Sequence, residues 1–199
     1  IIKKFLIILL FIMCIPNKLL SLTDNIDDWG IITLMYHRFD ENKYPSTNIK
    51  LEDFKKQLEL INKDFSFVNA NNFKNSLINE KNKRKVLLTI DDGFLSFYEK
   101  AWPILKRKKI PFILFVSTKE VGSSGYMSWD QINEISNEKF AHIGNHSYSH
   151  EYLIDRKNDE IIKDIKKSIL DFKKNTGHNS KFFSYPFGEY SINFKDIIK

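Results

Sequence analysis

The chain has 199 residues, of which 42% are hydrophobic and 28% are charged, and its formal net charge is +6. This length allows one domain with a sizeable core, and the composition excludes a disordered chain and a polytopic membrane protein. The lysines are scattered among acidic residues, as on a solvated face, so we expect no nucleic-acid partner.

The N-terminal segment differs from the rest of the chain. Lys3 and Lys4 precede an unbroken apolar run over residues 5–15, which Pro16 ends. This pattern is typical of a signal peptide, and the run has about half of the ~20 residues that a membrane-spanning helix needs. We expect residues 1–22 to be a signal peptide or membrane anchor, and the only membrane contact. The protein would then be exported to the periplasm, the extracellular space or the outer face of the cytoplasmic membrane.

Residues 29–199 show the pattern of one α/β domain. Short β-rich runs alternate with amphipathic stretches, which is typical of a largely parallel sheet, and most runs are apolar throughout, as strands covered on both faces should be. No linker suggests a further domain. The expected strands are residues 31–36, 65–68, 86–90, 112–116, 140–143 and 182–185.

Four helices are expected between these strands. Apolar residues recur at helical spacing in two core-facing helices, the second of which Gly177 would end. A third helix over residues 95–109 should be kinked or started by Pro103, and a shorter one over residues 130–136 has Ser128 as a candidate N-cap. The core-facing residues are Leu51, Phe54, Leu58 and Ile61 in the first helix and Ile161, Ile165, Ile169 and Phe172 in the second.

Two carboxylates follow the expected strand 86–90. In parallel α/β folds, functional groups gather beyond the carboxyl ends of the strands. Asp91 and Asp92 are adjacent, so their side chains point in different directions, and one can bind a metal while the other handles a proton. Asp-Asp-Gly can also be an ordinary turn or helix N-cap, and that alternative stays open at this point.

A pair of histidines follows the expected strand 140–143. His146 and His150 are four residues apart, which on a helix or in a tight turn brings two imidazoles side by side, although unrelated surface histidines are the alternative. Two histidines and one carboxylate with an open position form a known catalytic zinc pattern. The only cysteine, Cys14, lies in the N-terminal segment, so the domain offers no thiolate ligand or disulfide. We expect His142 to be a packed or hydrogen-bonded histidine instead.

These residues resemble the motifs of the polysaccharide deacetylase family, the carbohydrate esterases of family 4 with a NodB-type domain. Thr89-Ile90-Asp91-Asp92-Gly93 is similar to the family's Thr-Phe-Asp-Asp-Gly, and His146-Ser147-Tyr148-Ser149-His150 to its His-Ser/Thr-x-x-His. Residues 34–38, Leu-Met-Tyr-His-Arg, resemble the first strand of the poly-N-acetylglucosamine deacetylase branch. The resemblance, which spans residues 30–190, implies a distorted parallel (β/α) barrel and a metal-dependent carbohydrate deacetylase.

The resemblance also implies roles for these residues. Asp91 would be the general base, and Asp92, His146 and His150 would hold one divalent metal ion, by default zinc, with cobalt or nickel as alternatives. The reaction would remove N-acetyl groups from an N-acetylhexosamine polymer or a cell-envelope glycan. Two alternatives are an O-acetyl esterase acting on a polysaccharide and a non-catalytic glycan-binding protein.

Residues 184–188 resemble the family's third motif, Arg-x-Pro-Tyr-Gly. Ser184 stands where the motif has its base-orienting arginine, a substitution that can mark the poly-N-acetylglucosamine branch. The resemblance implies substrate binding by Tyr185, Pro186 and Phe187, with the Phe187 backbone N–H facing the oxyanion. We also expect His37, at the end of the first strand, to bind substrate or to act as an acid or base, with a buried structural role as the alternative.

The family's late Leu-x-His motif, which carries a catalytic acid, does not occur before Lys199. We therefore expect the chain to lack the last strands of its domain and the barrel to be incomplete at the C-terminus. His178 lies in an expected helix-to-strand loop, and we do not assign it the role of the acid.

Overall fold

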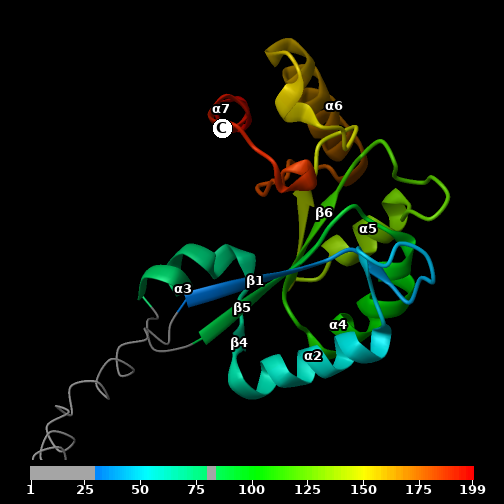
Figure 1. Cartoon of the computed structure of the whole chain (residues 1–199), viewed down its shortest axis with the longest axis vertical. Helices are drawn as coiled ribbons and strands as arrows, with labels where there is room; N and C mark the ends of the chain where they lie inside the picture. Colours follow the sequence, from blue (N-terminus) through cyan, green and yellow to red (C-terminus); the bar gives the residue numbers. More distant parts are fainter. Residues whose placement is uncertain (1–29, 80–83) are drawn as a thin grey trace, which may run out of the picture.

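The computed structural model describes residues 30–79 and 84–199 (Figure 1), so the expected signal segment lies outside the described residues. The helices are α2 (Leu51–Asp64), α3 (Phe73–Asn79), α4 (Trp102–Lys108), α5 (Trp129–Ser136), α6 (Asn158–Thr176) and α7 (Ile192–Ile198). The strands are β1 (Gly30–Tyr36), β2 (Arg38–Phe39), β3 (Asn48–Ile49), β4 (Ser66–Phe67), β5 (Arg84–Ile90), β6 (Phe112–Val116) and β7 (Ala141–Asn145). None of the helices in this part of the chain is long and apolar enough to cross a membrane.

A parallel sheet carries the fold, as expected. Its order is β1-β5-β6-β7, with β4 paired to the first half of β5. The strand order of the described residues is an open path rather than a closed ring. Because every pair in this sheet is parallel, the carboxyl ends of β5 and β7 lie at the same edge, and the loops that follow them meet there.

The main core lies between one face of the sheet and helices α2, α4 and α5, which cover that face in Figure 1. Phe54 of α2, Leu105 of α4 and Leu114 of β6 are all fully buried in it. The opposite face has a smaller cluster of Leu87, Ile113 and Phe115. Both clusters anchor β5 and β6, so the loops after these strands start from a rigid base.

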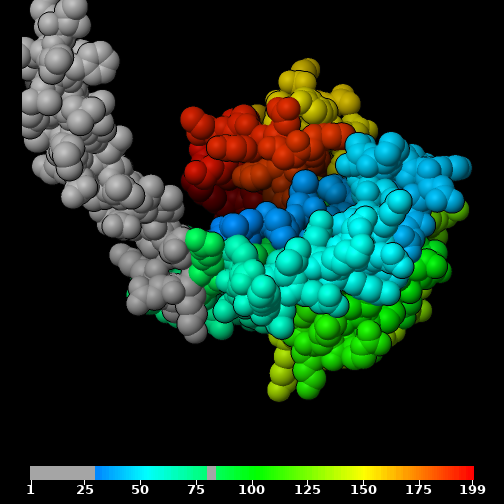
Figure 2. Space-filling model, turned by 60° about the horizontal axis from the view of Figure 1, so that its bottom comes forward, coloured from blue at the N-terminus to red at the C-terminus, as the bar shows by residue number. Residues whose placement is uncertain are grey.

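The expectation of strands covered on both faces holds for β5 and β6 but not for β1. Ile32 is 51% exposed and Met35 is 60% exposed, and β1 is an edge strand with one paired neighbour in the described sheet. In the space-filling view β1, in blue, reaches the surface beside the red C-terminal segment (Figure 2).

The helix signals in the sequence are confirmed at several ends. The hydroxyl of Ser128 accepts the Gln131 N–H in a capping box, and Gly177 ends α6 in the left-handed region at φ 75°. Residues 97–101 form a π-helical turn, and α4 then begins at Trp102 with Pro103 in its first turn, where the missing N–H needs no partner. Ile169 is a correction, since it is 40% exposed and does not face the core.

Two strand predictions near the candidate site need correction. The expected strand 140–143 begins at Ala141 and continues through Gly144 to Asn145. A Cβ at Gly144 would lie 2.2 Å from the Phe115 ring, so glycine is there for close packing. The expected strand 182–185 is reduced to one parallel bridge between Phe183 and Asn145, because the chain turns into a short 3-10 helix at Pro186.

Candidate metal centre

The first half of the site is the turn after β5. Asp92 and Gly93 both adopt the left-handed backbone region, with φ 73° and 81°. Two consecutive left-handed residues turn the chain sharply at the strand end, which an aspartate and a glycine tolerate better than most residues. The carboxylates of Asp91 and Asp92 therefore point to different places, as the sequence predicted.

The second half is the loop after β7, residues 146–150, which we call the histidine loop. It is not helical, and Ser147 and His150 have φ values of 67° and 54°. The Ser147 hydroxyl accepts the backbone N–H of His150 at 3.0 Å and closes the turn. The two imidazole rings lie side by side, with centroids 4.8 Å apart.

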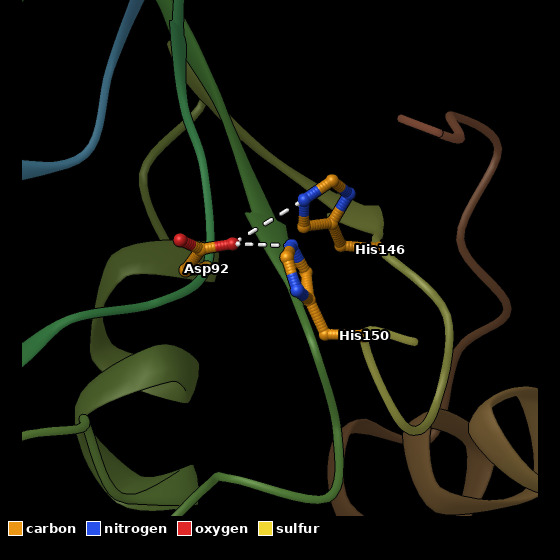
Figure 3. Close-up of side chains that lie close together, drawn as sticks. All are labelled: Asp92, His146 and His150. Carbon is orange, nitrogen blue, oxygen red and sulfur yellow. Dashed lines mark ion pairs between the residues drawn. The ribbon is translucent and has the colours of Figure 1, made fainter. Parts of the chain in front are cut away.

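The two halves meet at a single carboxylate oxygen. Asp92 Oδ1 lies 3.3 Å from His146 Nε2 and 3.1 Å from His150 Nε2, and Figure 3 shows both rings turned toward it. One ligand atom from each of the three residues lies within 4.8 Å of the others. The structure thus brings together the three residues that the sequence suggested as ligands.

The chemistry of these atoms suits a divalent metal. His146 Nδ1 is 2.8 Å from the Ser184 carbonyl oxygen, to which it donates, so in a neutral ring Nε2 carries a lone pair. Asp92 Oδ1 is buried and has no hydrogen-bond partner of good geometry. A carboxylate oxygen facing an imidazole lone pair is repulsive unless a cation lies between them, and two histidines with one carboxylate are zinc ligands.

Asp91 occupies a different environment. It is buried, its Oδ2 accepts the Ser184 hydroxyl at 3.2 Å, and its Oδ1 has no hydrogen-bond partner. Burial raises the pKa of Asp91 above its ordinary value, although the neighbouring histidines oppose this. Burial alone would also raise the pKa of Asp92, but the close approach of His146 and His150 lowers it well below its ordinary value. Opposite shifts in two adjacent carboxyls are typical of separate catalytic roles.

The other residues that the sequence predicted for the site differ in their burial and in the residues they contact. His37 is half-buried and is one of the two histidines that lower the pKa of Asp91 against the effect of burial. The Phe187 ring lies 4.8 Å from the His150 ring and is 59% exposed, in a left-handed backbone conformation at φ 60°. Pro186 is buried, and the Tyr185 ring packs instead against Phe183 and Phe194.

The two histidines outside this set lie elsewhere. His142 Nε2 is 2.8 Å from the Asn69 side-chain oxygen, and the His142 ring packs against Phe182, which confirms a packed and hydrogen-bonded histidine. His178 lies exposed in the loop after α6. Neither of them is one of the three residues that meet at Asp92 Oδ1.

Sequence reasoning missed several residues around the triad. A cavity of about 180 Å³ is lined by Asp92, His150, Ser117, Glu120, Tyr126 and Ser149. An antiparallel bridge between Phe94 and Tyr126 brings Tyr126 to this cavity. No spacing in the sequence indicates this pairing. The Tyr152 ring lies 5.3 Å from the Phe187 ring and extends the aromatic surface beside His150.

Known proteins resemble this chain in both sequence and structure. The family described as polysaccharide deacetylase matches residues 78–199. The poly-beta-1,6-N-acetyl-D-glucosamine N-deacetylase of Staphylococcus aureus strain MSSA476 is 30% identical over 130 residues, which are 59% of this chain and 45% of that protein. The chain therefore spans less than half the length of the curated relatives it matches.

Two solved structures have the same fold. IcaB from Ammonifex degensii superimposes with a TM-score of 0.77 at 28% identity, covering 85% of this chain and 79% of that one. The Streptococcus pyogenes deacetylase PplD, solved in complex with acetate, gives a TM-score of 0.73 at 25% identity over 84% of this chain and 78% of that one. The expected NodB-type α/β fold is confirmed by these neighbours.

Proposed function

Since the chain belongs to the polysaccharide deacetylase family, we propose that it is a metal-dependent hydrolase that removes N-acetyl groups from an N-acetylhexosamine polymer or a cell-envelope glycan. The observation that carries the proposal is the convergence of Asp92, His146 and His150 beside a second, buried carboxyl, Asp91. The relatives named as poly-beta-1,6-N-acetyl-D-glucosamine N-deacetylases support this class of substrate.

Asp92, His146 and His150 would hold the metal, and a bound divalent ion would polarise a water molecule and the acetyl carbonyl. Zinc is the ion we favour, with cobalt or nickel as alternatives. Asp91 would take the proton of the water, and the Ser184 hydroxyl holds the carboxylate for that task. The Ser184 carbonyl keeps His146 in the tautomer whose Nε2 can bind metal.

The remaining groups would act on the substrate. The backbone N–H of Phe187 would donate to the developing oxyanion, a contribution of ~3–4 kcal/mol for donors of this kind. The exposed Phe187 ring would contact the sugar, the buried Pro186 and the packed Tyr185 ring would hold the same segment against the substrate, and His37 would bind substrate or exchange a proton with it. We propose export through residues 1–22, membrane contact only through that segment, and no nucleic-acid partner.

The test combines metal content with acetate release from β-1,6-linked N-acetylglucosamine oligomers. We expect about one metal ion per parent chain, and loss of both metal and turnover in Asp92→Asn. Asp91→Asn should keep the metal and lose ~10²–10⁴-fold in turnover, because only the general base is removed. Asp159→Asn, an exposed acid in the first turn of α6, is the control and should match the parent.

Three results would point elsewhere. A parent chain that binds metal and oligomer without releasing acetate would support a glycan-binding role. Faster release from acetylated xylan than from the amide substrate would make the protein an O-acetyl esterase. A parent that releases acetate equally well after complete removal of metal would contradict metal-dependent catalysis.

A further inference from the structure

The conformation of the histidine loop depends on side chains from outside it. The backbone N–H groups of residues 147–150 donate to side-chain oxygens rather than to backbone carbonyls. Ser147 and His150 also adopt the left-handed region, which costs roughly 1–3 kcal/mol for each such residue. The carbonyl oxygens of Ser147 and Tyr148 accept the backbone N–H groups of Thr118 and Lys119, so main-chain bonds hold the carbonyl side of the loop and side-chain acceptors hold its N–H side.

Helix α6 supplies two of these four acceptors directly and holds a third, the Asn145 side chain, in place. Asp164 Oδ1 accepts the Tyr148 N–H at 2.8 Å, and Asp164 Oδ2 accepts the Ser149 N–H at 3.1 Å. One turn further along α6, the Ser168 hydroxyl accepts from the Asn145 amide at 2.8 Å, and the oxygen of that amide accepts the Ser147 N–H at 2.8 Å. Of these contacts, the pair made by Asp164 is the charge-assisted one, and therefore the stronger.

We propose that Asp164 is a positioning residue, which holds the histidine loop in the shape that directs both imidazole Nε2 atoms at Asp92. The proposal rests on the proposed metal site and adds to it a carboxylate that touches neither metal nor substrate. Tyr148 and Ser149 are the middle residues of the loop, so fixing their N–H groups fixes the separation of the histidines on either side. Such outer-shell partners typically change metal affinity by ~10–100-fold when they are removed.

The test measures the metal dissociation constant of the full chain by competition with a chromophoric chelator, using zinc. Asp164→Asn keeps one carbonyl oxygen and places an amide group against the second N–H, and Asp164→Ala removes both acceptors. We expect the dissociation constant to rise about tenfold in Asp164→Asn and further in Asp164→Ala. Asp164→Glu keeps both oxygens on a longer arm and should recover part of the affinity.

A matched control separates positioning from general stability. Glu160, one turn earlier on α6, also accepts a backbone N–H, that of Lys157 at 3.1 Å, and it does not hydrogen-bond to the histidine loop. Glu160→Gln removes a negative charge from α6, as Asp164→Asn does, and should leave the zinc dissociation constant unchanged whatever its effect on the melting temperature of the metal-free protein.

A second readout requires no metal. Amide hydrogen exchange of Tyr148 and Ser149 in the metal-free protein should be fast in Asp164→Ala and slow in both the parent and Glu160→Gln. If the parent bound no zinc, the proposed metal site would be wrong. If the parent bound zinc, and both Asp164→Asn and Asp164→Ala bound it equally tightly with unchanged exchange, only the role of Asp164 would be overturned.

Discussion

Ser184 connects the two chemical parts of the candidate site through two different oxygens. Its hydroxyl donates to Asp91 Oδ2 at 3.2 Å, and its backbone carbonyl accepts from His146 Nδ1 at 2.8 Å. Replacing the Ser184 side chain removes the hydrogen bond to Asp91 and leaves the hydrogen bond between the backbone carbonyl and His146 in place. The side chain therefore acts on the proposed base, and the main chain acts on the proposed metal ligand.

Replacing Ser184 with alanine should separate these effects. Asp91 loses a hydrogen bond that is worth ~1.5–3 kcal/mol when one partner is charged, so we expect kcat/KM to fall by roughly 10- to 100-fold. The metal content should match that of the parent. Steady-state acetate release with parallel metal analysis tests this, and Ser136→Ala, which removes a hydroxyl from the end of α5, is the control. Loss of metal in Ser184→Ala would contradict the assignment.

The metal affinity should depend on pH through His146. Burial alone would lower the pKa of this imidazole, but Asp92 and Asp91 outweigh it and raise the pKa above the ordinary 6.5 in the metal-free protein. Bound metal requires the unprotonated ring, so the apparent affinity should already fall as the pH drops through values above 6.5. Chelator competition between about pH 8.5 and 5.5 measures this. Affinity that stays constant down to the ordinary pKa of histidine would contradict it.

The sequence predicted the identity of the convergent residues better than their surroundings. Asp91, Asp92, His146 and His150 were recognisable because two short motifs carry them, each after an apolar run that forms a strand. Asp164 and Ser184 act through contacts between residues far apart in the chain, and an acid on a helix face looks like any solvated acid. The sequence showed that Ser184 stands where the family's motif has an arginine. It did not show that the Ser184 hydroxyl donates a hydrogen bond to Asp91.

At the scale of the elements, β7 owes its close approach to β6 to Gly144. The backbone of Gly144 is not in the left-handed region, so the requirement for glycine is steric: a Cβ would lie 2.2 Å from the Phe115 ring. Because β7 leads directly into the histidine loop, any shift of this strand moves both histidines.

Replacing Gly144 with alanine should therefore destabilise the protein by about 1–3 kcal/mol, the usual cost of overpacking a core. Thermal or urea unfolding of the metal-free protein measures this. In a Phe115→Leu background, which removes the clashing ring atoms, the same substitution should cost clearly less. Equal costs in both backgrounds would show that the Phe115 ring is not what excludes a side chain at residue 144.

Strands and long helices were predictable from patterning, but short elements were not. The apolar runs of β5 and β6 and the helical spacing in α2 and α6 reflect burial of whole faces, which leaves a strong signal. Helix α3 has seven residues, and its Leu77 and Ile78 are exposed, so no apolar face is present to detect. The limits of β7 depend on the packing of Gly144 against Phe115 of the neighbouring strand β6. The residues of β7 alone do not reveal this contact.

At the scale of the whole molecule, the candidate metal centre joins segments that are distant in the sequence. Asp92 follows β5, the two histidines follow β7, and α6 holds their loop. A ligand that binds only this assembled arrangement stabilises the folded state by mass action, by ~2.7 kcal/mol at one hundred times its dissociation constant. Metal binding and global unfolding should therefore be linked.

Removing the metal should lower the melting temperature. For a chain of this size, a stabilisation of that order corresponds to about 5–10 °C. Scanning calorimetry with zinc, after chelation, and after zinc is restored measures the shift and its reversal. Asp92→Asn should melt at the same temperature with and without zinc; a zinc-dependent shift that persists in this variant would place the bound ion elsewhere.

The wide separation of these segments along the sequence also affects the stage of folding at which the site can form. A chain that emerges with its N-terminus first presents Asp92 well before His146 and His150, and α6 and Ser184 follow only later. No earlier part of the chain contains the three ligands together with the groups that hold them. If the chain is exported as proposed, the ion would be acquired in the compartment where the segment from His146 to Ser184 folds, and the metal supply of that compartment would decide which ion is bound.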